Sequence, residues 1–211
     1  MRGTLRVLAV GIGVGLSSAA AAAPQIDLHL NAIISSSATP VSTPVITFEN
    51  LMNGTSGVLV IVKGIVGTEF LDALAFNYSG STTPTFNYIA GPQAAVTFDA
   101  NNVTLGPVGQ GGAGFDVLFD YPNDQASRFD GNDVVSVYTA TGAGVDETDF
   151  NVTNASGLFA MAHVNAIGPN AGSAFVAAPV PEAEVYAMLL AGLGLLGFVM
   201  GRRRRSVVPA I

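Results

Sequence analysis

The chain of 211 residues contains no cysteine and no tryptophan, and only 11% of its residues are charged. Without cysteine there is no disulfide, no thiolate nucleophile and no sulfur ligand for a metal. A domain of ordinary size does not need disulfides, so their absence agrees with export without proving it. The length allows one such domain flanked by terminal segments.

Basic residues are scarce and unevenly placed. Six of the eight Lys and Arg residues lie near the two ends of the chain. Residues 24–181 hold two basic residues, Lys63 and Arg128, against thirteen acidic ones, a formal charge of −11. A surface of that sign repels phosphate backbones and anionic lipid. We therefore expect no nucleic-acid binding by this part of the chain.

The N-terminal segment MRGTLRVLAVGIGVGLSSAAAAAPQ has a short basic start, an apolar run over residues 7–16 and then small residues. This order is typical of a secretory signal peptide. The alternative, a retained membrane helix, is disfavoured because ten apolar residues span only about 15 Å, half of the hydrocarbon core. We predict a signal peptide over residues 1–22, cleaved after Ala22. Its partners would be the secretion translocon and signal peptidase.

The C-terminal segment contains an uncharged stretch of sixteen residues, 185–200, followed by four consecutive arginines. Such a stretch makes about 24 Å of helix, enough to cross a membrane that thins slightly or lets the arginines snorkel. Arginine beside a membrane segment stays on the cytoplasmic side, so the preceding domain would face outward. The alternative is a buried C-terminal helix, which would leave the arginines without neighbouring carboxylates in the sequence.

These features predict a Pro-Glu linker over residues 179–184, a transmembrane helix over 185–201 and an Arg-rich cytoplasmic tail over 202–211. The linker carries the short motif, and the arginines act as a stop and orientation signal for the inner membrane. The motif residues are Val180, Pro181 and Glu182, and the signal residues are Arg202, Arg203, Arg204 and Arg205.

The order, spacing and terminal position of these parts resemble the PEP-CTERM sorting signal of exported bacterial proteins. The stretch YAMLLAGLGLLGF is similar to the helix of that family, whereas Ala183 stands where the family usually has a second proline. The resemblance implies recognition by an exosortase, a membrane-embedded cysteine protease that would act near the Pro-Glu motif. It also implies a protein held in the inner membrane for a time, with its domain outside the cytoplasm, and then placed in the envelope or outside the cell.

Residues 23–178 contain about eight short runs rich in β-branched and aromatic residues, separated by Gly, Pro, Asn and Asp. In the run FDVLFDY, alternation predicts Phe115, Val117 and Phe119 on one face. No amphipathic helix is evident, so we predict an all-β ectodomain, an antiparallel β-sandwich of jelly-roll type. Residues 35–44 are predicted to form a loop or arm. The runs begin at residues 45, 57, 73, 94, 114, 133, 149 and 158.

Residues 55–178 also resemble an ectodomain type that is often attached to the same sorting signal. Two of the stretches that carry this resemblance are GAGFDVLFDYP and SRFDGNDVVSVYTATG. It implies a fold and a context but no activity.

Residue types used in catalysis are few. His29 and His163 are the only histidines, and no G-x-S-x-G or H-E-x-x-H pattern occurs. A pair of carboxylates could hydrolyse a glycoside, but close pairs arise by coincidence among thirteen acids. We therefore predict a protein that is not an enzyme, with hydrolysis as the alternative.

Acidic residues crowd into the stretch DYPNDQASRFDGND. Ca²⁺ takes about six to eight oxygen ligands from carboxylates, amides and loop carbonyls, so Asp120, Asp124, Asp130 and Asp133 are candidate calcium ligands. Their spacing does not match the EF-hand pattern. The alternative is that they are ordinary turn formers, with Arg128 satisfying one carboxylate. No other cofactor is predicted.

Two functions follow from the sequence. The first is an exported structural or matrix protein, without enzymatic activity, delivered to the envelope or to exopolysaccharide. The second is a secreted carbohydrate-binding or carbohydrate-cleaving β-sandwich that uses the same route. Aromatic side chains on one exposed face would favour the second, whereas the lack of Trp and the presence of only five Tyr favour the first.

Overall fold

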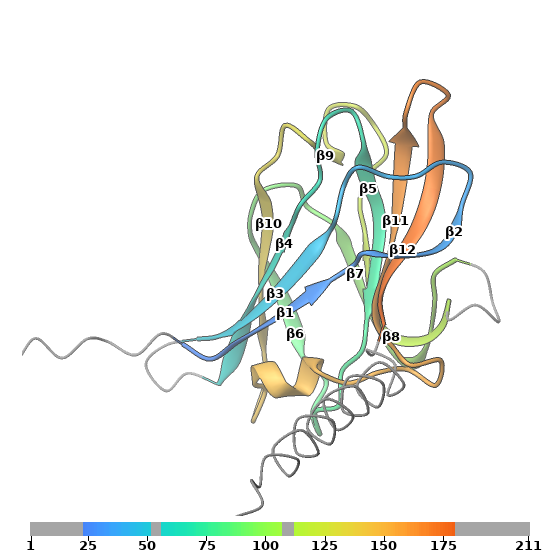
Figure 1. Ribbon diagram of the computed structural model, residues 1–211. Coiled ribbons are helices and arrows are strands. Elements are labelled where there is room, and N and C mark those ends of the chain that lie inside the picture. Colours follow the sequence, from blue (N-terminus) through green and yellow to red (C-terminus); the bar gives the residue numbers. More distant parts are fainter. Residues whose placement is uncertain (1–22, 52–55, 107–111, 180–211) are drawn as a thin grey trace, which may run out of the picture.

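Two antiparallel β-sheets pack face to face in the computed structural model, which describes residues 23–51, 56–106 and 112–179 (Figure 1). The elements are β1 (Gln25–His29), β2 (Ala32–Ser36), β3 (Val45–Asn50), β4 (Gly57–Lys63), β5 (Phe70–Phe76), β6 (Thr85–Ala90), β7 (Ala95–Thr104), β8 (Ala113–Asp120), β9 (Phe129–Asp130), β10 (Val135–Thr141), the 3₁₀ helix η1 (Glu147–Phe150), β11 (Leu158–Ile167) and β12 (Gly172–Pro179). The five-stranded sheet has the order β1-β3-β4-β10-β6. The seven-stranded sheet has the order β2-β12-β11-β5-β8-β7, with β9 paired to β5.

The main core lies between the sheets and follows from the alternation of each strand. In β4, Val58, Val60 and Val62 are fully buried, whereas Leu59 and Ile61 between them are partly exposed. Phe76 of β5 lies at the centre of an aromatic group. Its ring centroid is 5.4 Å from those of Phe48 and Phe119 and 6.0 Å from that of Phe150. Edge-to-face contacts of this kind stabilise a core beyond the area that they bury.

A second apolar cluster covers the outer face of the seven-stranded sheet. The strands β5, β11 and β12 place small or flexible side chains on this face, because successive side chains of a strand point to opposite faces of the sheet. The cluster consists of Ala73, Ala75, Val103, Leu105, Phe115, Leu158, Met161 and Ala177. The far half of the β7–β8 hairpin, residues 101–106 and 112–116, contributes to it, and we call this part the hairpin arm.

The hairpin arm folds across the sheet instead of continuing along it. Pairing between β7 and β8 jumps from Phe98–Val117 to Val103–Phe115, so four residues of β7 oppose Asp116 alone. At the other end of the arm, a Cβ on Gly106 would lie 2.7 Å from a ring carbon of Phe175 in β12. Because β12 lies three strand spacings from β8, about 14 Å, the arm must cross β5 and β11 to reach it.

A buried carboxylate fixes the bend where the arm begins. Asp116 is only 5% exposed, and its two oxygens accept hydrogen bonds from the backbone N–H groups of Tyr78 and Asn101, each at 2.7 Å. Asn101 adopts the left-handed conformation, with φ of 57°, as bulged residues often do. Both oxygens of the buried Asp116 carboxylate therefore have hydrogen-bond partners at the bend.

The antiparallel sandwich predicted from the sequence is confirmed. The described residues form twelve strands, whereas a jelly roll has eight. In addition, β3–β4, β7–β8 and β11–β12 each place two consecutive strands in one sheet, so this topology differs from the predicted jelly-roll type. The predicted loop at residues 35–44 is correct from residue 37 onward, since Ser35 and Ser36 end β2.

Two local predictions were wrong. The run from residue 149 is not a strand, because its first residues belong to η1, which Asp146 caps. The Asp146 side chain accepts from the Thr148 N–H at 2.9 Å, and the Asp149 side chain accepts from the Asp146 N–H at 3.2 Å. Phe115 does not share a face with Val117, because it belongs to the outer cluster and Val117 to the main core. The irregular pairing at the bend breaks the alternation.

The two ends of the sandwich differ in what they carry. Leu158 pairs with Pro179 at one end of the seven-stranded sheet, where the described chain stops. Asn165 pairs with Phe70 at the other end, and Phe70 pairs in turn with Asp130 of β9. We call these the exit end and the loop end. In Figure 1 they lie at the bottom and the top.

We expect residues 23–179 to fold without the terminal segments, because β12 completes the main core with Ala174, Val176 and Ala178. Circular dichroism of this fragment should show a strand spectrum and one cooperative unfolding transition. A matched fragment ending at residue 171 lacks β12 and should not unfold cooperatively. A helix-dominated spectrum, or equal stability of the two fragments, would contradict the fold.

Candidate functional site

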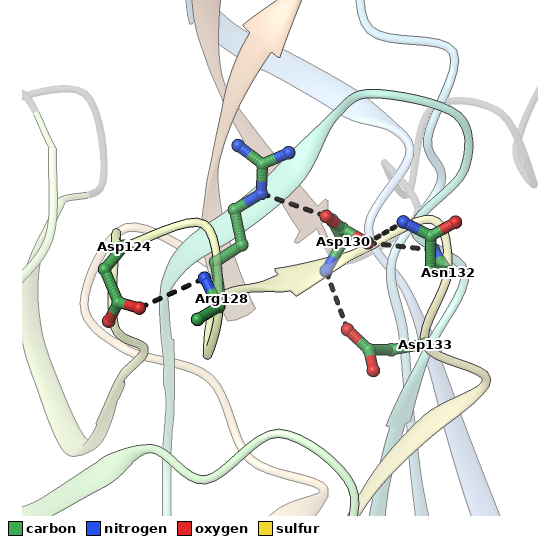
Figure 2. A network of polar contacts seen from close by, with 6 residues as sticks. Asp124, Arg128, Asp130, Asn132 and Asp133 are labelled. Carbon is green, nitrogen blue, oxygen red and sulfur yellow. Dashed lines mark hydrogen bonds and ion pairs between the residues drawn. The ribbon is translucent and has the colours of Figure 1, made fainter.

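A polar cavity of about 370 Å³ lies at the loop end, where the β6–β7 turn faces the loop that carries the candidate calcium ligands. Its charged and amide-bearing lining residues are Gln93, Gln125, Arg128, Asp130, Asn132 and Asp133. Figure 2 shows the loop side of this site. The acidic loop therefore borders a space large enough for a small ligand.

Asp124 holds a turn within this loop. Its carboxylate accepts hydrogen bonds from the Ser127 hydroxyl and, at 3.1 Å, from the Ala126 N–H. Its carbonyl oxygen accepts from the N–H groups of Ser127 and Arg128 at 3.2 and 3.0 Å. The Ser127 hydroxyl is the main reason why the pKa of Asp124 lies below its usual value. This carboxylate therefore acts as a turn former.

Asp130 is the best-satisfied carboxylate of the loop. One of its oxygens accepts from the backbone N–H of Asn132 at 2.9 Å and from its side-chain amide at 2.8 Å. The other accepts from Nε of Arg128 at 3.0 Å (Figure 2). The hydrogen bond from the Asn132 backbone, followed by that from Arg128, lowers the pKa of Asp130.

Asp133 and Asp120 have surroundings that differ from those of these two carboxylates. Asp133 accepts from the Asp130 N–H at 3.1 Å, and its own N–H donates to the Asp130 carbonyl at 2.9 Å. Asp120 ends β8, is exposed, and stands opposite Ala73 and Ala95 in the sheet. Across residues 23–51, 56–106 and 112–179, no three His, Cys, Asp or Glu side chains are grouped so that they could hold a metal ion.

Arg128 is fixed on two sides. Its Nε donates to Asp130, and its guanidinium carbon lies 5.0 Å from the centroid of the Phe70 ring, a cation–π contact. Its two terminal nitrogens have no hydrogen-bond partner among the described residues, and in Figure 2 they point away from the other labelled side chains. The pairing of Arg128 with Asp130 agrees with the alternative to the calcium hypothesis, in which Arg128 satisfies one carboxylate. Nothing in the sequence indicated that the terminal nitrogens remain available.

The opposite rim of the cavity, residues 91–93, is held in place by two buried side chains. The Tyr121 hydroxyl bonds to Ser136 Oγ at 3.1 Å, and Ser136 donates to the Pro92 carbonyl at 2.7 Å. Burial raises the pKa of Tyr121 far above its usual value, so this hydroxyl stays neutral. The turn needs Gly91, whose φ is 85°, because a Cβ there would lie 2.0 Å from the Val135 carbonyl oxygen.

His163 lies away from this cavity, on the outer face of the seven-stranded sheet with Met161. In the neighbouring strand β5, Asp72 is the unpaired residue of a bulge opposite His163. Its Oδ2 lies 2.6 Å from Nδ1 of His163. The imidazole stacks on Phe175, with centroids 4.3 Å apart. In the described part of the chain, no hydrogen bond to its other ring nitrogen is found.

Several residues named from the sequence lie outside the described residues. They are the signal peptide 1–22, the motif Val180, Pro181 and Glu182, the helix 185–201 and Arg202 to Arg205. The described residues contain no helix that is long and apolar enough to cross a membrane.

The fold defines an all-β sandwich domain whose last strand, β12, leads directly into the C-terminal segment. Residues 179–205 of that segment match the family model described as the PEP-CTERM protein-sorting motif. The chain therefore carries a PEP-CTERM sorting domain, the signal of an exported, envelope-associated protein that an exosortase processes. Searches of curated proteins and of solved structures found no match.

The calcium hypothesis stays a prediction with a direct test. A cation bound only by the folded state would stabilise it by about 2.7 kcal/mol at a hundredfold excess over Kd. Thermal unfolding in millimolar Ca²⁺ and in EGTA, at fixed ionic strength, should then differ, and Asp130→Asn with Asp133→Asn should abolish the difference. Equal melting temperatures in Ca²⁺ and in EGTA would contradict the calcium hypothesis. They would identify these residues as turn formers, in agreement with the hydrogen bonds observed within their turns.

Asp130 should make the stability of the domain depend on pH. Its folded pKa is lowered, so its contribution is complete above the unfolded pKa of about 4 and is lost as pH falls through the folded value. We expect Asp130→Asn to cost about 1 kcal/mol at pH 7 and progressively less as the pH falls below about 4, as measured by urea unfolding. The exposed Asp120→Asn is the control and should change stability by no more than about 0.5 kcal/mol at pH 7. A cost for Asp130→Asn that does not change with pH would contradict this role.

Proposed function

We propose that the protein is a structural or interaction component of the cell envelope or extracellular matrix, without enzymatic activity, that reaches its place as an exosortase substrate. The observation that carries this proposal is the sorting motif at residues 179–205, which begins at the last residue of β12. The folded domain is thus joined to its sorting signal without an intervening domain. Exopolysaccharide is the proposed partner at the final location.

Before processing, we propose, the helix over residues 185–201 anchors the chain in the inner membrane with the sandwich outside. Five residues separate Pro179 from residue 185, an extended reach of at most about 20 Å. The exit end would therefore lie near the membrane surface, whereas the loop end with its polar cavity would point away from it. A domain held in this way offers its loops to the surroundings.

A second candidate function is carbohydrate binding. It is favoured by Tyr88, a residue that is 42% exposed and whose hydroxyl donates to the carbonyl of Gly91 on the cavity rim at 2.6 Å. Cleavage of carbohydrate is less well supported, because Asp130 and Asp133 are engaged in hydrogen bonds within their own loop. Binding without cleavage agrees with the first proposal.

The sorting role predicts that the chain is cut twice, near Ala22 and between residues 179 and 185. The intact mass of the protein from envelope and medium fractions should show both new termini. Replacing the motif residues Pro181 and Glu182 by Ala should abolish the second cut and leave the first, because signal peptidase acts elsewhere. The matched control is Gln25→Ala, which leaves the motif intact. If cells that contain an exosortase kept residues 186–211 on the dominant species, a permanent anchor would replace the sorting role.

A further inference from the structure

The cavity at the loop end combines unused hydrogen-bond donors and acceptors in one small space. Arg128, held by Asp130 and Phe70, is one of the lining residues, although its terminal nitrogens point away from Asp133 (Figure 2). The acceptors include Asp133, only one of whose oxygens receives a hydrogen bond from the described residues. The side chains of Gln93 and Gln125 have no hydrogen-bond partner among those residues and offer both kinds of group.

The charges around the cavity exclude simple ions as its best ligands. An anion would be attracted by Arg128 but repelled by Asp133 and by the formal charge of −11 over residues 24–181. A cation would meet the guanidinium, and the carboxylates are not grouped as a metal site within the described chain. Hydroxyl groups donate and accept at once, so a neutral ligand with several hydroxyls satisfies both sets of groups.

We propose that this cavity binds one unit of a neutral polysaccharide. Gln93 and Gln125 donate to sugar oxygens, and Asp133 accepts from a hydroxyl group. The volume of about 370 Å³ lies near the lower end of the range of small-molecule sites, roughly 300–1,000 Å³, which fits a short stretch of sugar rather than a long one.

Tyr88 extends the site along the molecule. Its hydroxyl is bonded to Gly91 on the rim, so its exposed ring lies beside the cavity on the edge strand β6. The ring also contacts Tyr138 edge to face, with centroids 5.7 Å apart, which limits its freedom. An exposed and positioned aromatic ring provides an apolar surface for the C–H face of the next sugar unit.

The two rims of the cavity are held in place before any ligand arrives. Ser136 and Tyr121 hold one rim, and Asp124 and Asp130 hold the other through turns of their own. Rims fixed in this way reduce the conformational entropy lost on binding, whereas the exposed side chains of Gln93 and Gln125 still lose theirs. Because the cavity is polar and buries little apolar surface, we expect dissociation constants of about 0.1–10 mM for short oligosaccharides and tighter apparent binding to long chains, which rebind.

Saturation-transfer NMR on the full chain, in a zwitterionic detergent without sugar, tests the site. The neutral probes are oligosaccharides of glucose, galactose and mannose, and the anionic probes are oligomeric alginate and inorganic phosphate. We expect transfer to at least one neutral probe at about 10 mM and none to the anions. Gln93→Ala with Gln125→Ala should weaken binding about tenfold, because each lost hydrogen bond costs several-fold. Tyr88→Ala should weaken binding to longer oligomers more than to disaccharides.

The control is Gln25→Ala in β1, the same substitution far from the cavity, which should bind as the wild type does. Equal melting temperatures of all variants would show that the fold is kept. The site would be overturned by binding of the anions alone, by wild-type affinity of the double variant, or by the lack of transfer to every neutral probe. The choice of polysaccharide rests on the proposed export of the domain, but the binding test does not depend on processing. A failed binding test would therefore leave the sorting role intact, and a failed sorting test would leave the site intact.

Discussion

The structure depends on burying both faces of the seven-stranded sheet. Its inner face packs on the five-stranded sheet through the main core, and its outer face packs under the hairpin arm. Burial on both faces explains why β5 and β12 lack polar residues over most of their length, for example in the stretches ALAF and AFVAA. The small residues Ala73, Ala75 and Ala177 lie on the outer face beneath the arm, where bulkier side chains would keep it from packing closely.

Such double burial brings polar groups into the interior, and Asn77 and Glu69 are two that are satisfied there. Asn77, 2% exposed, donates to the carbonyls of Leu158 and Phe159 at 2.8 and 2.9 Å and so holds the start of β11. Glu69, 4% exposed, accepts from the N–H groups of Val41 and Ser42 at 2.8 and 2.7 Å. Buried side chains that bind backbone in this way position loops as firmly as strands do.

The loop end gains its rigidity from the same source, whereas the exit end carries the sorting signal. The proposed sugar site therefore lies at the opposite end of the sandwich from the sorting signal. Both cations of the described domain, Lys63 and Arg128, lie toward the loop end, because Lys63 pairs with Val135 at the start of β10. The domain is therefore acidic at its exit end, where Asp146, Glu147 and Asp149 surround η1.

The sequence by itself determined the all-β class, the positions of most central strands and the sorting motif, because each depends on local order. Alternation in β4 and β10 or the succession of Pro-Glu, apolar run and arginines can be recognised within about thirty residues. Five strands were not predicted: β1, β2, β6, β9 and β12. Their segments are short, rich in small residues, or lie on sheet edges, and they become strands only when a neighbouring strand pairs with them.

Tertiary structure alone decided the hairpin arm and the polar cavity. The bend at Asp116 requires the N–H of Tyr78, 38 residues away in sequence, and the cavity joins the β6–β7 turn to a loop more than thirty residues further on. The sequence drew attention to the four Asp residues through their density, but it could not show which of their oxygens local turns would occupy. Hydrogen bonds between distant segments leave no periodic pattern in the sequence, and for that physical reason Arg128, Gln93 and Gln125 could be brought together only by the fold.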